Sequence, residues 1–362
     1  MIIIIGPFPD PIDGCSFANF ILASNFKKND IPFKIINTNV KKVSSTQGNK
    51  FSLFKMLLFL KSYKGILKIL FASKIYITPG QTFYGIIKYS PFIILAYFLK
   101  VPYVIHLHGN YLGKEYISLK GIKKKLFTFL VSNASAGIVL SNSLRGNFNN
   151  LIPDSRVYVV YNFVEKDILS TFSSINSKPK DFLRILFLSN LIEEKGIIDF
   201  LNACVILKLK QIPFKATVAG AFDNAVRVKV NSLFSQLDQS LDYLGVINGN
   251  DKLNAFINSN VFILPTYYKM EGQPISLLEG LAAKNIIITT NHAGIPDIIS
   301  SKNGFLVNPK SPQQIADILT DISYNLSDYL DKYSKFNFEY AESNFSEEIF
   351  TSKVLNVIEN VR

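Results

Sequence analysis

Glu271 and Glu279 stand on the two sides of the point where a loop gives way to a predicted helix. Gly272 tolerates a tight turn and Pro274 suits the first turn of a helix, which predicts a helix over residues 273–283. Its buried face, which Glu279 flanks, is predicted to consist of Ile275, Leu278, Leu281 and Ala282. Two carboxylates beside a helix N-terminus can bind hydroxyl groups at both ends of a ligand whose phosphates lie on that terminus. The pattern therefore indicates a site for a nucleotide-sugar.

Lys195 follows a predicted strand, residues 185–189, and precedes a predicted helix, residues 196–210. A lysine at such a corner can reach a diphosphate, and the backbone amides that begin at Gly196 add positive potential. A fixed cation there would stabilise a leaving diphosphate, on which negative charge develops. An ordinary surface lysine is the alternative that the sequence leaves open.

His106 and His108 lie at the end of a predicted strand over residues 103–107. Alternation along a strand places the two imidazoles on the same side. A zinc site is not favoured, because the only other histidine is His292 and no cysteine lies near. We expect His108, at the strand end, to serve a binding site, and His106 to be a packed or hydrogen-bonded core residue.

The opening strand, residues 2–5, runs into a Pro-rich loop that leads to a predicted helix over residues 16–28. Gly14 would let the backbone approach a ligand closely, and Ser16 is expected to cap the helix. A Pro-rich turn without a ligand is the alternative.

Strands and helices alternate along both halves of the chain. The predicted strands of the first half are residues 2–5, 33–36, 75–78, 103–107, 137–140 and 157–160. Those of the second half are residues 185–189, 216–219, 261–264 and 286–289. Segments of helical period between them include residues 16–28, 120–132, 196–210 and 273–283. Continuous apolar strands separated by helices predict an α/β fold of two doubly wound, Rossmann-like domains facing a central cleft, with ligands at the carboxyl ends of the strands.

The expected domain organisation, with the roles that the family resemblance given below implies, places an acceptor-binding domain first and a nucleotide-sugar-binding domain second. We expect the first domain over residues 1–165, a polar linker over 166–180 and the second domain over 181–345. A last helix, residues 346–362, is expected to cross back to the first domain. Two later segments, 294–297 and 303–307, are read as turns of the second domain.

Composition restricts the class of protein. The chain of 362 residues is 48% hydrophobic and has no low-complexity tract, which excludes a disordered chain. No apolar run is long enough to span a membrane, and the N-terminal residues are interpreted as a strand and not as a signal peptide. The two cysteines, Cys15 and Cys204, are expected to be reduced and structural, in a cytoplasmic protein.

The net charge of +12 is concentrated in the first half. Residues 1–160 carry 20 basic and 5 acidic side chains, and the remainder carries 19 basic and 22 acidic. This asymmetry indicates an anionic partner, although AT-rich codon composition is an alternative source of lysine. A helix over residues 50–71 would place on one side Lys50, Lys61, Lys64 and Lys68, beside Phe54, Leu57, Leu58 and Phe59; a second basic cluster is Lys120, Lys123, Lys124 and Lys125. Such clusters fit an anionic membrane surface, and no motif for nucleic acid is present.

Over nearly its whole length the chain resembles the retaining glycosyltransferases of the GT-B fold, family four (glycosyl transferases group 1). The resemblance implies that Glu271 contacts the hydroxyls of the donor sugar and that Glu279 contacts the ribose. Asn190, Gly272 and Gln273 are expected to belong to the same donor-binding site. It further implies that Lys195 stabilises the leaving diphosphate. His108 would lie near the transferred sugar and Gly14 near the phosphates and the acceptor. The family usually has an arginine in place of Asn190 beside the phosphates, and often two adjacent glycines where this chain has Gly14 and Cys15.

The resemblance implies a metal-independent hexosyltransferase that needs no cofactor besides its nucleotide diphosphate sugar donor. The expected acceptor is lipid-linked or a polysaccharide, in bacterial cell-surface glycan or lipopolysaccharide synthesis. The expected location is the cytoplasm, at the inner face of the plasma membrane. Two alternatives stay open at this point: a sugar-nucleotide epimerase of the same fold, and a catalytically inactive GT-B partner subunit.

Overall fold

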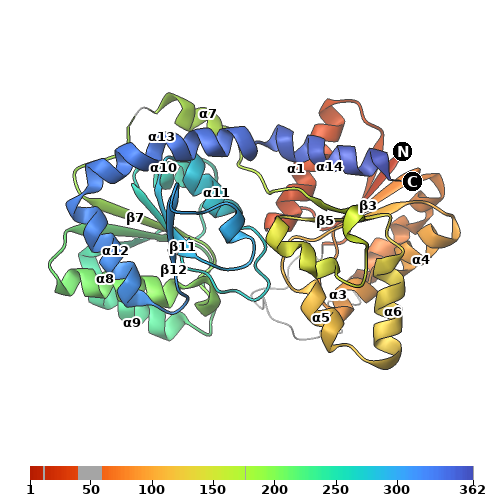
Figure 1. Ribbon diagram of the computed structural model, residues 1–362, viewed down its shortest axis with the longest axis horizontal. Helices are drawn as coiled ribbons and strands as arrows, with labels where there is room; N and C mark the ends of the chain where they lie inside the picture. Colours follow the sequence, from red (N-terminus) through yellow and green to blue (C-terminus); the bar gives the residue numbers. More distant parts are fainter. Residues whose placement is uncertain (11–12, 40–58, 176, 362) are drawn as a thin grey trace. The chain divides into compact units, whose positions relative to one another are not determined.

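The computed structural model describes residues 1–10, 13–39, 59–175 and 177–361 (Figure 1). The chain forms two compact units. Unit 1 comprises Met1–Asn162 and Glu347–Arg362, and unit 2 comprises Phe163–Ser346. Each unit is built around a six-stranded sheet in which every pair of neighbouring strands is parallel. The predicted α/β fold of two doubly wound sheets is confirmed.

The sheet of unit 1 has the strand order β2-β1-β3-β4-β5-β6. Its strands are β1 (Ile2–Gly6), β2 (Phe33–Asn37), β3 (Lys74–Ile77), β4 (Tyr103–His106), β5 (Ala136–Val139) and β6 (Val157–Val159). The four isoleucines of β1 are buried on both faces, as expected for a central parallel strand covered by helices.

The helices of unit 1 cover both faces of this sheet (Figure 1). They are α1 (Gly14–Lys28), α3 (Phe83–Ile87), α4 (Ser90–Phe98), α5 (Leu112–Ser118), α6 (Gly121–Ser132) and α14 (Glu347–Asn360), with 3₁₀ helices η1 (Leu60–Phe71), η2 (Asn142–Phe148) and η3 (Asp154–Arg156). The last helix, α14, packs on α1 and β3, and Lys74 Nζ donates a hydrogen bond of 2.8 Å to the carbonyl of Val361. The end of the chain therefore belongs to the unit in which the chain begins.

The sheet of unit 2 has the strand order β12-β11-β10-β7-β8-β9. Its strands are β7 (Leu183–Leu188), β8 (Phe214–Ala219), β9 (Leu241–Tyr243), β10 (Val261–Leu264), β11 (Ile286–Thr290) and β12 (Gly304–Val307). Its helices are α7 (Lys166–Ser174), α8 (Ile197–Leu209), α9 (Arg227–Leu237), α10 (Gly249–Ile257), α11 (Ile275–Ala282), α12 (Pro312–Tyr324) and α13 (Leu326–Asn344), with 3₁₀ turns η4 (Glu193–Lys195), η5 (Asp238–Ser240) and η6 (Ile295–Asp297). Strands β7 and β10 are neighbours, so the loops that follow them lie at the same edge of the sheet.

Several elements differ from the sequence expectation. Residues 166–180, expected as a linker, lie in unit 2 and include α7, because Ile168 and Phe172 are buried beneath a surface of serines and threonines. The segment 303–307, read as a turn, contains strand β12, whose Gly304 packs directly against Ile287. Strand β9 has no apolar run to predict it, since it is a short, partly exposed edge strand. Of the predicted helix over residues 50–71, only the part from residue 59 lies within the described residues.

Candidate functional site

Two loops of unit 2 are joined at the carboxyl edge of its sheet. The loop 189–196 follows β7, and the loop 265–274 follows β10. The amide of Tyr267 donates a hydrogen bond of 2.7 Å to the carbonyl of Glu194, and Thr266 Oγ1 reaches the same carbonyl at 3.3 Å. Gly196 has a left-handed φ of 82°, and a Cβ there would lie 2.4 Å from the carbonyl oxygen of Pro265. Only glycine fits this corner, which sets where Lys195 emerges.

Lys195 and Glu271 meet across this junction. Lys195 Nζ lies 2.7 Å from Glu271 Oε2, and Thr266 Oγ1 donates to the same carboxylate oxygen at 2.9 Å. The side chain of Glu271 is 8% exposed and that of Lys195 16% exposed. Lys195 Nζ also lies 5.3 Å from the ring centroid of Tyr268. The carboxylate is therefore held by two donors, while the ammonium faces an aromatic ring.

The loop that carries Glu271 is braced by the last residue of β11 and by residues that follow this strand. Thr290 Oγ1 donates to the carbonyl of Thr266, and His292 Nε2 lies 2.8 Å from the carbonyl of Tyr268, so this ring nitrogen carries the proton. The amide of Gly294 donates to the carbonyl of Gly272 at 3.1 Å. These bonds fix the backbone of the loop before any ligand binds.

The remaining predicted binding residues of unit 2 lie around the same loops. Gly272 and Gln273 are buried between Glu271 and α11, and Gln273 is 3% exposed. Pro274 is the N-cap of α11 and not a residue of its first turn, since its ψ of 124° is extended. Asn190 is exposed directly after β7, and its carbonyl accepts a hydrogen bond of 2.9 Å from the amide of Ile192.

Glu279 lies within the buried part of α11, in agreement with the expectation that it flanks the apolar stripe and does not face open water. It is 2% exposed, because α11 packs against α7, α13, β10 and β11 and is buried from Leu277 to Ala282. Ile275, predicted for the stripe, is only half-buried. Burial raises the pKa of Glu279, and the nearby carboxylate of Glu165 acts in the same direction.

Glu279 is paired with Lys252 of α10. Lys252 Nζ lies 2.7 Å from Glu279 Oε1 and also donates to Glu165 Oε1. Burial opposes the charged form of Lys252, but the two carboxylates outweigh it and raise the pKa of the ammonium. Sequence reasoning missed Lys252, since no spacing along the chain connects a lysine of α10 to a glutamate of α11.

In unit 1, the rings of His106 and His108 contact each other at the end of β4, tilted by 34°. Their ring centroids are 4.2 Å apart, and His106 Nδ1 lies 2.6 Å from the hydroxyl of Tyr76. The expectation that His106 is a hydrogen-bonded core residue is confirmed. His108 is half-buried as a residue, yet both of its ring nitrogens are buried and have no hydrogen-bond partner among the described residues. Burial lowers the pKa of His108 to about 4, so it is a neutral imidazole at neutral pH.

Gly14 is the first residue of α1, at the end of the opening loop. Residues 11 and 12 of that loop lie outside the described residues. The expectation that Ser16 caps α1 is wrong: Asp13 is the N-cap, and Ser16 completes a capping box in which the Asp13 carboxylate accepts from the Ser16 amide at 2.8 Å. The start of the loop is held by Asn19, whose Nδ2 donates to the carbonyl of Pro7 at 2.9 Å.

The structure therefore brings Lys195 and Glu271 into contact and pairs Glu279 with a cation that was not predicted. In the part of the chain that the structure describes, no group of three or more His, Cys, Asp or Glu side chains could hold a metal ion. Both cysteines are free.

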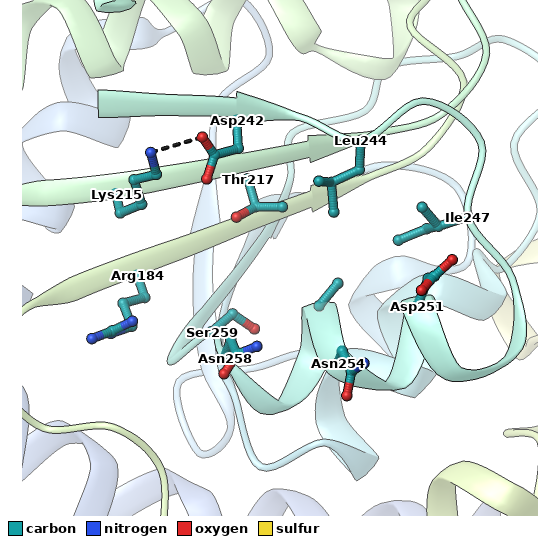
Figure 2. Close-up of a pocket in the computed structure, with 11 residues that line it drawn as sticks. Arg184, Lys215, Thr217, Asp242, Leu244, Ile247, Asp251, Asn254, Asn258 and Ser259 are labelled. Carbon is teal, nitrogen blue, oxygen red and sulfur yellow. Dashed lines mark ion pairs between the residues drawn. The ribbon is translucent and has the colours of Figure 1, made fainter. Parts of the chain in front are cut away.

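A hollow of about 620 Å³ in unit 2 contains none of the predicted site residues (Figure 2). Its walls come from α10 and from the faces of β7, β8 and β9: Arg184, Lys215, Thr217, Asp242, Leu244, Ile247, Asp251, Asn254, Ala255, Asn258 and Ser259. Lys215 and Asp242 neutralise each other at 2.8 Å across the edge strands. The hollow is therefore separate from the two loops described above.

Comparison with known proteins shows which proteins the chain resembles. Residues 170–336 match the family Glycosyl transferases group 1. The chain is 28% identical over 152 residues to the amylovoran biosynthesis glycosyltransferase AmsK of Erwinia amylovora, covering 40% of this chain and 37% of AmsK. Other relatives are named for colanic acid and teichuronic acid biosynthesis, and the matches span 46% and 55% of their lengths. The chain thus spans about half the length of the curated relatives it matches, or less.

Two solved structures resemble the whole chain. A glycosyltransferase from Rickettsia africae gives a TM-score of 0.74 at 17% identity, covering 99% of this chain and 97% of that chain. The structure of Anabaena HepE in complex with UDP gives a TM-score of 0.71 at 14% identity, covering 99% of this chain and 100% of that chain. Together with the two doubly wound parallel sheets, these likenesses define the class: the chain has the GT-B fold of glycosyltransferases. Within unit 2, residues 170–336 resemble the family glycosyl transferases group 1.

Proposed function

We propose that this chain is a retaining glycosyltransferase that moves a sugar from a nucleotide diphosphate donor to a lipid-linked or polysaccharide acceptor in bacterial cell-surface glycan synthesis. The observation that carries the proposal is the contact of Lys195 with Glu271, at the carboxyl edge of a parallel sheet and inside the segment that matches the family. The names of the relatives, which refer to bacterial polysaccharides, support the acceptor class.

Lys195 supplies the cation for the leaving group. The bond from the anomeric carbon to the diphosphate breaks, the bond from that carbon to the acceptor oxygen forms, and a diphosphate oxygen takes the acceptor proton. Negative charge grows on the diphosphate as it departs, and a fixed ammonium with the N-terminus of α11 stabilises it without a metal ion. Glu271 accepts hydrogen bonds from the donor sugar and orients it on the face where the acceptor attacks.

The other predicted residues have supporting roles in this proposal. In unit 2, Glu279 binds the ribose, and Asn190, Gly272 and Gln273 line the donor. In unit 1, His108 acts on the transferred sugar as a neutral imidazole, and Gly14 permits close approach of the backbone to the substrates.

The proposal is tested by incubating the protein with UDP-, GDP- and ADP-sugars and following release of the nucleoside diphosphate, with mass spectrometry of the product. Retention predicts that the anomeric proton of the product keeps the donor configuration in NMR spectra. Metal independence predicts unchanged turnover in excess EDTA. Glu271→Gln removes the charge without changing the shape of the side chain, and we expect a loss of about 100-fold or more in kcat.

The rival functions give different outcomes in the same experiment. Conversion of a nucleotide-sugar into its epimer without an acceptor would favour an epimerase. The neutral Asn190, where the family usually has arginine, is the one feature that favours an inactive partner subunit. Turnover by the isolated chain excludes that role, whereas nucleotide binding without turnover of any donor supports it.

The acceptor proposal includes contact of unit 1 with an anionic membrane surface. Exposed apolar side chains lie beside lysines on two helices of unit 1. Ile122 on α6 is 77% exposed, and Leu67 on η1 is 66% exposed. The lysines concerned are Lys61 and Lys64 on η1, and Lys123 and Lys125 on α6 with Lys120 just before it. Apolar side chains that enter the lipid interface, with cations at the headgroups, fit such a surface. In the described part of the chain, no helix combines the length and apolar character needed to span a bilayer.

Liposome sedimentation tests the membrane contact. We expect binding to phosphatidylglycerol vesicles at low salt, little binding to phosphatidylcholine vesicles, and loss of binding in Lys61→Glu/Lys64→Glu. The matched control is Lys302→Glu/Lys335→Glu in unit 2, which changes the net charge equally. Equal loss in both double variants would mean that net charge alone drives binding.

A further inference from the structure

Lys252 is a cation shared by two carboxylates of unit 2. Its Nζ lies 2.7 Å from Glu279 Oε1 and also donates to Glu165 Oε1. The side chains of Lys252 and Glu279 are 14% and 3% exposed, and that of Glu165 is 31% exposed. Lys252 lies on α10 and Glu279 on α11, and Glu165 is the residue before α7, so three elements meet at one ammonium.

A carboxylate as buried as Glu279 needs a partner to remain ionised. Burial and the neighbouring Glu165 both raise the pKa of Glu279, and Lys252 counteracts them. An ionised carboxylate is the stronger acceptor for a hydroxyl group, and only the ionised form offers both oxygens as acceptors. The contact with Lys252 therefore bears directly on what Glu279 can bind.

Glu165 gives the ammonium a second anchor. A lysine side chain has several rotatable bonds, and a single contact leaves much of that freedom. Contacts to two carboxylates from separate elements restrict the ammonium to one place, which in turn fixes Glu279 Oε1.

We propose that Lys252 is a positioning residue for nucleotide binding, which balances the charge of Glu279 and fixes its carboxylate in the orientation that receives a ribose hydroxyl. The inference rests on the proposed function, in which Glu279 contacts the ribose of the donor. Lys252 itself acts through Glu279 and does not contact the substrate.

The experiment is a calorimetric titration of UDP, GDP and ADP into the full chain over pH 5.5–8.5. Lys252→Gln should bind the preferred nucleotide about tenfold more weakly at pH 7.5, and Lys252→Arg should restore affinity to within about threefold. The pH at which affinity is lost on acidification should rise in Lys252→Gln, because Glu279 then takes up a proton more readily. Lys335→Gln, on the exposed surface of α13, is the matched control and should bind as the parent does.

A double variant separates positioning from a general structural effect. In the background of Glu279→Gln, the change Lys252→Gln should cause no further loss of affinity. An equal loss in that background, or unchanged affinity and pH profile in Lys252→Gln alone, would overturn the inference.

If the parent protein binds none of the three nucleotides, that result contradicts the proposed function. The control of Glu279 by Lys252 is then tested by a second measurement, which needs no ligand. Without Lys252, the folded-state pKa of Glu279 rises further above its unfolded value, so stability is lost as pH rises from about 4.5 through the folded pKa. Urea denaturation of Lys252→Gln should show this loss relative to the parent, and Glu279→Gln should abolish it. Parallel pH curves for Lys252→Gln and the parent would show that Lys252 does not control Glu279.

Discussion

Lys195 Nζ and Glu271 Oε2 are 2.7 Å apart, and the two residues come from loops that follow neighbouring strands of unit 2. The pair places a cation and an anion side by side at the carboxyl edge of the sheet. In the proposed reaction the ammonium attracts the departing phosphates while the carboxylate keeps hold of the sugar.

The first prediction concerns this ion pair. Lys195→Met leaves the buried carboxylate of Glu271 with Thr266 as its remaining donor, and we expect the free energy of unfolding to fall by about 3 kcal/mol. Adding Glu271→Gln removes the unpaired charge and should restore most of that stability without restoring turnover. Urea denaturation and turnover, measured on the same samples, check both parts; recovery of turnover in the double variant would contradict the assigned roles.

The second prediction concerns Gly196. In Gly196→Ala, the new Cβ would collide with the carbonyl of Pro265 and the residue would keep a left-handed φ of 82°. We expect a loss of about 2 kcal/mol or more in the free energy of unfolding and a larger proportional loss of turnover, because the corner positions Lys195. The matched control is Gly245→Ala, at a φ of 68° with nothing within 4 Å of the new Cβ, where only the backbone strain of about 1 kcal/mol is expected.

The third prediction concerns acid sensitivity through His108. The pKa of His108 is about 4 in the folded chain, below its ordinary value of 6.5. Between pH 4 and 6.5, His108 is therefore protonated in the unfolded chain and neutral in the folded chain. Stability should therefore fall as pH decreases from about 6.5 to 4, by about 3 kcal/mol from this residue. His108→Gln should flatten that part of the stability curve in urea denaturation at a series of pH values. An unchanged slope would show that His108 does not stay neutral in the fold.

The fourth prediction concerns Lys178, a buried lysine that donates to the carbonyl of Phe256. Burial, with a contribution from Lys284, lowers its pKa from 10.5 to about 7. Between these values the unfolded chain is protonated and the folded chain is not, so stability should rise with pH, by about 1 kcal/mol per unit from pH 7 to 9. Lys178→Met should remove this rise and be more stable than the parent below pH 7. Identical slopes would contradict the assignment.

The sequence predicted the central strands well because their isoleucines and valines form continuous apolar runs, which is typical of parallel strands buried on both faces. It predicted the corner at Lys195 and the loop at Glu271 from turn residues, which act locally. It missed strand β9, whose exposed edge position gives no such run, and the asparagine-rich start of α10 gave no sign of the role of Lys252. The pairing of Lys252 with Glu279 depends on how helices pack, and that information is not local in the sequence.

The burial of Glu279 is a second example of a feature that depends on how helices pack. Its apolar neighbours suggested one buried stripe, but α11 is covered by helices and strands on most sides, so a charged residue lies inside with its own cation. A helical pattern predicts which residues share a face, but not how many faces are covered.

In the proposed function, unit 2 binds a nucleoside diphosphate through the loops of Lys195 and Glu271. This binding is tested by calorimetric titration of UDP, GDP and ADP into the parent protein, Lys195→Met and the control Lys335→Gln. We predict that the parent and the control bind one of the three nucleotides and that Lys195→Met binds it at least about tenfold more weakly. Binding of that nucleotide with equal affinity by Lys195→Met, or no binding of any of the three by the parent, would contradict the claim.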